Sequence, residues 1–215
     1  MRLLGCIHLN ESQKTCEELY EREVDWDQGY KLNLDSRLVV LGMNRLLAHA
    51  RSAFQCDLLT EGENVGLVIA CGTGSLSSYQ EFFESMRVNK LRPPTYTQAM
   101  PSTAAAAISI CYSIQGPTIM LTNSTTGPLW KVAWDESLNL IQFEHCDTVI
   151  VGCWHIEALL ADPADGLCQV TLAALKGEGD EGLGLGEVTL SGDIAVSKTA
   201  PVDFWSSLES IGIRQ

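Results

Sequence analysis

The sequence predicts a single α/β domain in which helices cover both faces of a mixed or parallel sheet. Short apolar runs alternate along the chain with segments whose apolar residues recur at helical spacing. The length of 215 residues suits one large domain, and 46% apolar against 19% charged residues is enough for a substantial core. Neither a linker nor an internal repeat divides the sequence, so we predict one domain over residues 1–215.

The first half of the chain predicts two strands and two helices. A short apolar opening predicts a lead-in strand, and the acidic segment that follows, EELYEREVDWD, is expected to be solvated surface. Helical spacing predicts a helix over 36–54, capped by Asp35 or Ser36. The run NVGLVIACGTG predicts a buried strand and turn, and SLSSYQEFFESMR predicts a helix. Pro93 and Pro94 predict irregular backbone through KLRPPTYTQ.

The second half continues the alternation. AAAAISICYSI predicts a helix of small residues, TIMLTN a buried strand, and PLWKVAWDESLNLIQFE a helix that tolerates Pro128 in its first turn. TVIVGCW and GLCQVTLAAL predict two more strands, and EVTLSGDIAV is a candidate fifth strand. The segment DFWSSLESIGI predicts a helix with Phe204 and Trp205 on one face. His145 and His155 are expected in loops beside a strand.

Charge excludes some classes of function. Acidic residues outnumber basic ones 27 to 14, for a formal charge of −13, which disfavours nucleic acid and anionic membranes as partners. No apolar run is long enough to span a bilayer, and the N-terminus lacks the features of a secretory signal. We therefore expect a cytoplasmic protein.

The cysteines and glycines do not indicate a metal or a cofactor. None of the eight cysteines forms a C-x-x-C pair, so reduced, buried thiols are expected, with neither a disulfide framework nor a metal site. The turn Gly72-Thr73-Gly74-Ser75-Leu76-Ser77 has no third glycine where dinucleotide binding needs one. It is expected to be a compact strand-to-helix turn, and no cofactor is predicted.

Ser124 is the residue with the strongest case for chemistry. It lies in LTNSTTG, between a predicted strand and a predicted helix, where the helix macrodipole and backbone N–H groups favour a nucleophile and an oxyanion. The segment is not G-x-S-x-G, and a serine needs a base at neutral pH. A helix N-cap is the alternative role for this residue.

Four segments, in this order, resemble the N-terminal half of the β-ketoacyl synthases of the thiolase fold. These are GLVIACGTGSLSSYQEFFESM, the stretch from RPPTYTQAMPSTAAAAISICYSI through QGPTIMLTNSTTG, and CDTVIVGCWHIEA, and the resemblance covers roughly residues 36–175. In the family, a cysteine nucleophile stands at the position of Ser124, and two catalytic histidines lie in a C-terminal half that this sequence does not contain. The resemblance therefore implies a half-fold without the condensation chemistry.

Chain-length factors resemble ketosynthases in this way, and the sequence looks most like the short type that accompanies aryl-polyene-like synthases. The resemblance implies a non-catalytic subunit that pairs with an active ketosynthase and shapes the acyl tunnel in fatty acid or polyketide (polyene-type) biosynthesis. In the fold, the strand TIMLTN pairs across the dimer axis and the preceding helix lines the partner's tunnel. Candidate tunnel or interface residues are Gln98, Met100, Ser102, Thr103, Thr122 and Asn123.

Partners and alternatives follow from the same resemblance. The acidic surface suits indirect contact with an acyl carrier protein, through the ketosynthase. Trp130, Trp134, Phe204 and Trp205 belong either to the partner interface or to the core. Two other functions stay open: a thioester acyltransferase or hydrolase with Ser124 as its nucleophile, and a homodimeric scaffold without a tunnel.

Overall fold

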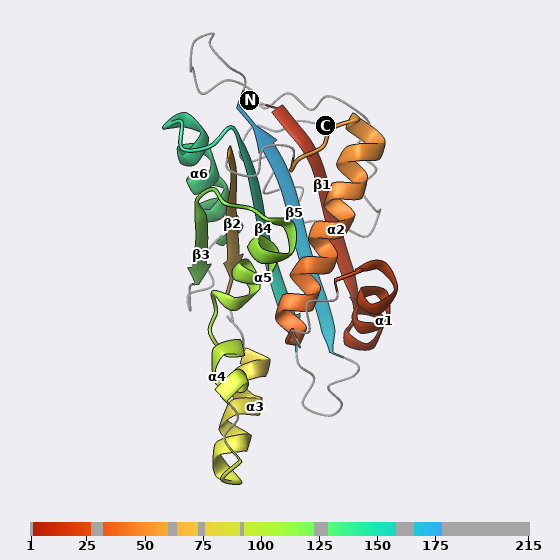
Figure 1. Ribbon diagram of the computed structural model, residues 1–215, viewed down its shortest axis with the longest axis vertical. Helices are drawn as coiled ribbons and strands as arrows, with labels where there is room; N and C mark the ends of the chain where they lie inside the picture. The colour runs from red at the N-terminus through yellow and green to blue at the C-terminus, as the bar shows by residue number, and fades with distance from the viewer. Residues whose placement is uncertain are drawn as a thin grey trace.

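A mixed five-stranded sheet forms the centre of the molecule (Figure 1). The computed structural model describes residues 2–26, 32–59, 64–72, 76–90, 93–122, 129–157 and 166–177. The sheet has the strand order β1-β5-β4-β2-β3. Its strands are β1 (Arg2–Ser12), β2 (Val65–Cys71), β3 (Thr118–Thr122), β4 (Thr148–Glu157) and β5 (Leu167–Lys176).

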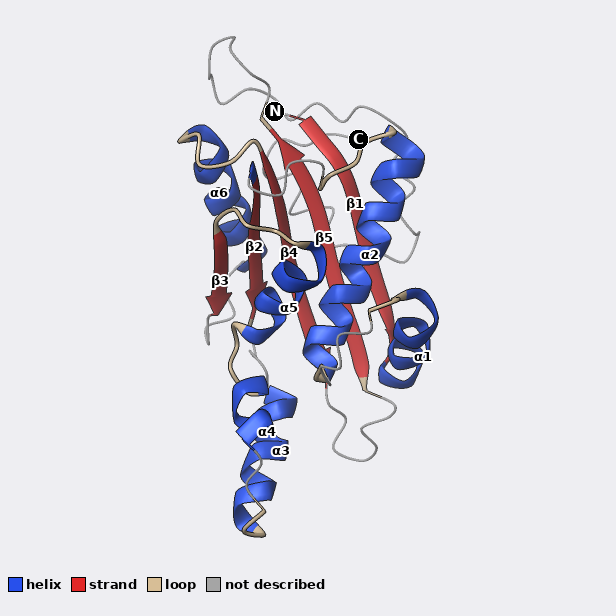
Figure 2. Ribbon diagram, in the orientation of Figure 1, coloured by secondary structure: helices blue, strands red, loops and turns tan. Residues whose placement is uncertain are grey.

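Helices cover both faces of this sheet, as predicted. They are α1 (Gln13–Glu23), α2 (Leu34–Phe54), α3 (Leu76–Arg87), α4 (Pro93–Gln98), α5 (Thr103–Tyr112) and α6 (Leu129–Gln142). Figure 2 shows α2 crossing one face of the sheet with α5 beside it. Leu67 and Ile69 of β2 pack in a core with α2 and α5, whereas Val68 packs with α6 on the opposite face. The α/β fold class is thus confirmed.

The position of β2 inside the sheet, between β4 and β3, explains why its sequence is apolar throughout. All seven of its residues are buried, because it pairs with β3 on one side and β4 on the other and has helices on both faces. Trp134 of α6 is only 1% exposed and packs near Trp130, with ring centroids 6.1 Å apart. Of the two roles predicted for Trp134, the structure supports the core.

The directions of the strands determine which strand ends lie together at each end of the sheet. β2 is parallel to β3 and β4, whereas β5 is antiparallel to both β4 and β1. The register pairs Cys71 with Thr122 and Ala70 with Cys153. The carboxyl ends of β2, β3 and β4 therefore meet at one edge, which we call the carboxyl edge.

The cap of α2 differs from the prediction. The N-cap is Asn33, whose Oδ1 accepts a hydrogen bond of 2.9 Å from the backbone N–H of Ser36. Asp35 and Ser36 lie inside the first turn and are buried, at 2% and 0% exposure. Asp35 does not cap the helix because its carboxylate accepts a 3.0 Å hydrogen bond from the indole Nε1 of Trp154.

The acidic segment expected to be solvated surface is half-buried or exposed over its described residues 17–26, and most of it forms helix α1, which Ser12 caps through Thr15 N. Two further predictions were wrong in detail. The irregular segment around Pro93 forms the short helix α4, because N–H groups of a first turn have no partner within the helix and proline is tolerated there. His155 lies within β4, not in a loop, and is exposed.

Some predictions concern residues outside the described ranges. They include the candidate strand 187–196, the helix 203–213 with Phe204 and Trp205, and residues 73–75 of the glycine turn after β2. In the ranges that are described, no helix combines the length and apolar character needed to cross a membrane.

Candidate functional site

The carboxyl edge is where the predicted nucleophile position falls. Thr122 ends β3 level with Cys71 of β2, and on β4 the residue at the same level is Trp154, which follows Cys153, the partner of Ala70. Ligands of α/β sheets bind outside the carboxyl ends of the strands. Asn123 and Ser124 follow Thr122 directly in the chain but lie outside the described residues. Of the residues predicted at this position, the structure therefore places Thr122.

The N-terminus of α2 lies at the same edge. Its first-turn residue Asp35 accepts the hydrogen bond from Trp154 of β4, at 3.0 Å, and both side chains are buried. A carboxylate in the first turn of a helix is favoured by the macrodipole. This buried pair holds the start of α2 against the end of the sheet, and sequence reasoning did not identify it because the two residues are 119 positions apart.

A pair of helices projects from the carboxyl edge, and we call α3 together with α4 the arm (Figure 1). The two helices contact each other through the rings of Phe82 and Tyr96, whose centroids are 5.5 Å apart. The arm and the turn that follows it expose large apolar side chains, with Phe83 at 56%, Tyr96 at 54% and Met100 at 42%. Apolar side chains gathered at this degree of exposure indicate an interaction surface.

Four predicted tunnel residues come together in the turn between α4 and α5. The hydroxyl of Thr103 donates a 2.6 Å hydrogen bond to the carbonyl of Thr97, which closes the turn. Met100 and Ser102 are exposed, whereas Gln98 and Thr103 are half-buried. Met100 and Ser102 thus face outward, where a partner can contact them.

Asn33 connects this turn and the arm to α2. Its Nδ2 donates to the hydroxyl of Ser78 on α3 and to the backbone carbonyl of Gln98, each at 2.7 Å. Ser78 is only 4% exposed. Asn33 could not be predicted from the sequence, because its partners lie 45 and 65 residues away.

Three of the described thiols are poorly suited to nucleophilic chemistry. None of the eight cysteines forms a disulfide; five are buried as predicted, whereas Cys56, Cys111 and Cys153 are only half-buried. Burial raises the pKa of Cys6, Cys111 and Cys153 to about 12, so these groups are protonated at neutral pH. Among the described residues, no three His, Cys, Asp or Glu side chains are grouped to hold a metal ion.

The imidazole of His8 is part of a buried polar contact rather than of the carboxyl edge. Its Nδ1 lies 2.8 Å from the hydroxyl of Thr171, across the β1–β5 pair. Burial lowers the pKa of His8, so that the neutral ring is favoured. The contact is a cross-strand hydrogen bond, and it gives no base for a residue at the end of β3.

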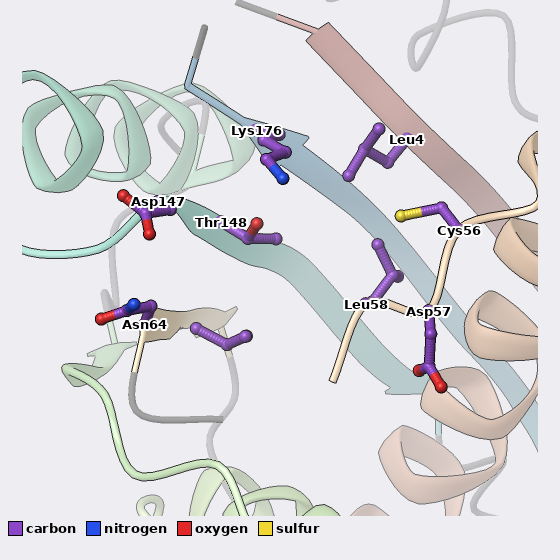
Figure 3. Close-up of a pocket in the computed structure, with 9 residues that line it drawn as sticks. Leu4, Cys56, Asp57, Leu58, Asn64, Asp147, Thr148 and Lys176 are labelled. Atoms are coloured by element: carbon purple, nitrogen blue, oxygen red, sulfur yellow. The ribbon is translucent and has the colours of Figure 1, made fainter. Parts of the chain in front are cut away.

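A pocket lies at the opposite end of the sheet (Figure 3). Val65 and Thr148 contribute to it from the starts of β2 and β4, and Lys176 contributes from the end of β5. Asp147, also in its lining, has its backbone N–H bonded to the carbonyl of Asn64 at 3.0 Å. None of the predicted site residues lines this pocket, so it is separate from the candidate site.

The fold and the carboxyl edge define the class of protein. Helices on both faces of a mixed sheet, with a parallel edge strand leading into the nucleophile position, are the features expected of the thiolase-fold condensing enzymes. The family model for the β-ketoacyl synthase N-terminal domain matches residues 31–161, more than half of the 215 residues. The chain belongs to the β-ketoacyl synthase family.

Solved structures agree on the fold. The ishigamide ketosynthase/chain length factor superposes with a TM-score of 0.58 at 17% identity, over 75% of this chain and 49% of that one. A type II polyketide ketosynthase complex with its acyl-carrier protein, AntDE:AntF, gives 0.57 at 10% identity, over 81% and 62%. The ketosynthase ApeO with its chain length factor ApeC, from Xenorhabdus doucetiae, gives 0.51 at 13%, over 82% and 79%.

This chain therefore spans about half of the first of these structures and less than two thirds of the second. No curated protein sequence matches it. At identities of 17% and below, the superpositions establish the thiolase-like fold that the sequence predicted.

Proposed function

We propose that this protein is a chain-length-factor-like subunit that pairs with an active ketosynthase and shapes the acyl tunnel of the complex. The proposed products of the complex are polyketide or fatty acid chains of the polyene type. Family membership supports the class, and both the ishigamide protein and the ApeO–ApeC pair combine a ketosynthase with a chain length factor.

The observation that carries the proposal is the free edge of the sheet at β3. This strand is last in the strand order and pairs with β2 alone among the described strands. Its five residues are half-buried or exposed, in contrast with the fully buried β2. An open edge of this kind is a template for a strand of another chain.

The register specifies which backbone groups are available. Leu67 is paired with Thr118, and its N–H donates to the carbonyl of Pro117 at 2.8 Å. In a parallel ladder of this pattern, the residues flanking Thr118 bond to β2, and the alternation continues along the strand. Thr118, Met120 and Thr122 therefore direct their own N–H and C=O groups away from β2, toward a partner strand.

The arm and the following turn supply a second contact region. Met100 and Ser102 are exposed between α4 and α5, and α5 packs beside β3, where Ser109 and Thr118 hydroxyls lie 3.3 Å apart. We infer that residues 98–103, together with Thr122 and Asn123, contribute to the tunnel and the subunit interface. If so, replacing Met100 with a bulkier residue should limit how far the acyl chain extends into the tunnel.

The proposal assigns condensation to the partner. Serine replaces the family's cysteine at position 124, and the described thiols with raised pKa are protonated at neutral pH. We take the chain as one domain over residues 1–215, acting in the cytoplasm without a cofactor. Its charge of −13 leaves docking of the acyl carrier protein to the partner.

Pairing through β3 is tested by Met120→Pro against Met120→Ala. Both variants lose the half-buried Met120 side chain, but only proline removes the outward N–H. Co-expressed with a tagged ketosynthase from the same gene neighbourhood, Met120→Ala should co-elute on size exclusion and Met120→Pro should lose most of the complex. Equal recovery of both variants would contradict pairing through this edge.

Ser124 separates this function from a thioester acyltransferase or hydrolase. In the complex, Ser124→Ala should leave condensation largely intact, because the partner holds the nucleophile. Intact-mass measurement after incubation with an acyl thioester should show no adduct on the isolated chain. A stable adduct that disappears in Ser124→Ala would replace the proposed function with acyl transfer.

A further inference from the structure

The arm is attached to the rest of the molecule differently from the other helices. α2, α5 and α6 bury apolar faces on the sheet, and each contributes fully or nearly fully buried residues to a core. In α3 and α4, by contrast, the residues of known exposure are mostly exposed, and no described residue of either helix belongs to a core cluster. The position of the arm therefore depends on a few specific contacts more than on burial.

Asn33 makes those contacts with both helices of the arm at once. One amide hydrogen bonds the hydroxyl of Ser78 and the other bonds the carbonyl of Gln98, each over 2.7 Å. The acceptor oxygen of the same side chain caps α2 through Ser36 N at 2.9 Å. The amide is the only neutral side-chain group that donates twice and accepts at once in this geometry.

The rigid side of this connection is α2. Asn33 precedes Asp35, which is held to β4 by the bond from Trp154, and α2 packs into the core from Leu38 to Ala50. Gln98 on the other side opens the turn that leads to Met100 and on to α5. A displacement of Asn33 relative to Gln98 therefore moves the turn relative to the carboxyl edge.

We propose that Asn33 is a positioning residue: its side-chain amide sets the placement of the turn 98–103 against the carboxyl edge and thereby the chain length that the tunnel admits. The part on chain length rests on the proposed function, whereas the placement of the turn does not. Asn33 acts through Gln98 and Ser78, without itself contacting the acyl chain.

Two substitutions separate positioning from helix capping. Asp and Ser at position 33 both keep an acceptor for Ser36 N–H, so α2 stays capped. Asn33→Asp loses both donors. The Ser78 hydroxyl can turn to donate to the new carboxylate, but the hydrogen bond from position 33 to the Gln98 carbonyl is lost. Serine at position 33 adds no charge, and its side chain is too short to reach Gln98. Asn33→Ser therefore provides the same test if Asn33→Asp fails to fold.

The matched control is Asn44→Asp on the same helix. Asn44 Nδ2 donates to the backbone carbonyl of Glu23 at 2.9 Å, which is an equivalent amide-to-carbonyl bond directed at α1 instead of the arm. It makes the same chemical change without contacting α3 or the turn. A general loss of stability would affect both variants alike.

The first measurement is hydrogen–deuterium exchange of the isolated chain over residues 76–103. Both position-33 variants should accelerate exchange there by about tenfold, the effect of losing one or two hydrogen bonds, while Asn44→Asp leaves that region near wild type. Exchange within twofold of wild type in the position-33 variants, or equal acceleration in Asn44→Asp, would overturn the positioning role.

The second measurement is the product-length distribution of the reconstituted complex. The position-33 variants should broaden or shift it while total condensation stays comparable, and Asn44→Asp should leave it unchanged. Faster exchange with an unchanged distribution would uphold the placement of the turn by Asn33 and overturn the proposed tunnel role of residues 98–103.

Discussion

Two regions of the molecule differ in where their apolar side chains lie. The first is the interior of the sheet with its covering helices, and the second is the arm together with the edge strand β3. In the first region, all seven residues of β2 are buried and Trp134 is 1% exposed. In the second, Phe83 is 56% exposed, and β3 is half-buried or exposed along its length. Apolar residues of the first region stabilise the isolated chain, and those of the second are available to bind another chain.

The largest expected effect on the free energy of unfolding comes from replacing one aromatic residue in each region with alanine. Trp134→Ala removes a buried side chain and leaves a cavity, which should lower the free energy of unfolding by about 3–5 kcal/mol. Phe83→Ala removes an exposed ring and should change it by less than about 0.5 kcal/mol. Urea denaturation of the isolated variants measures both values, and similar losses would remove the distinction between the regions.

The second prediction concerns the bond that joins α2 to the sheet. Trp154→Phe deletes the indole N–H that Asp35 accepts at 3.0 Å in a buried setting, and should cost about 1–3 kcal/mol of unfolding free energy. The same denaturation series gives the value. A loss below about 0.5 kcal/mol would show that this contact does not hold the helix in place.

The smallest effect is expected at a surface ion pair between α1 and α2. Glu23 accepts two hydrogen bonds from Arg45, at 2.8 and 2.9 Å, and one from the adjacent Arg22 at 2.9 Å. The bonds from Arg45 first, and then the bond from Arg22, lower the pKa of Glu23 from 4.5 to about 2. Because the folded pKa is lowered, the stabilisation is present above about pH 4.5 and is lost as the pH falls toward 2. Both side chains are partly exposed, so we expect about 0.5–1 kcal/mol.

Glu23→Gln tests that ion pair, with Glu18→Gln on the exposed side of the same helix as its control. Thermal denaturation between pH 2 and 7 should show a smaller acid-induced loss of stability in Glu23→Gln, with little change in the control. Parallel curves for wild type and Glu23→Gln would contradict the assigned role of the pair.

The same contrast explains what the sequence could predict. Buried strands such as β2 and β4 have apolar runs that identify them directly. The run TIMLTN identified β3 in the same way, but β3 is half-buried or exposed where the pattern predicted a buried strand. Asp35 and Ser36 both suit a cap by residue type, yet Asn33 caps α2, because Asp35 binds Trp154. The helix-capping preference of a residue type carries no information about contacts with residues that lie far away in the sequence.

Within the arm, helix α3 was predicted from the sequence, whereas α4 was not. Pro93 and Pro94 break a helix in its interior but not in its first turn, so the same residues fit an irregular loop or the start of α4. The contact of Asn33 with Ser78 and Gln98 exists only in the folded chain. Residues 98–103 were proposed from the family resemblance, and the structure adds that Met100 and Ser102 of that turn are exposed.

The measurement that tests the central claim most directly is the product length made by the reconstituted complex with Met100→Trp. Met100 is 42% exposed, so the larger side chain should leave the unfolding free energy of the isolated chain within about 0.5 kcal/mol of wild type. If this subunit shapes the tunnel, the complex should assemble normally and release shorter acyl chains. An assembled, active complex with an unchanged product distribution would contradict a role for this chain in setting product length.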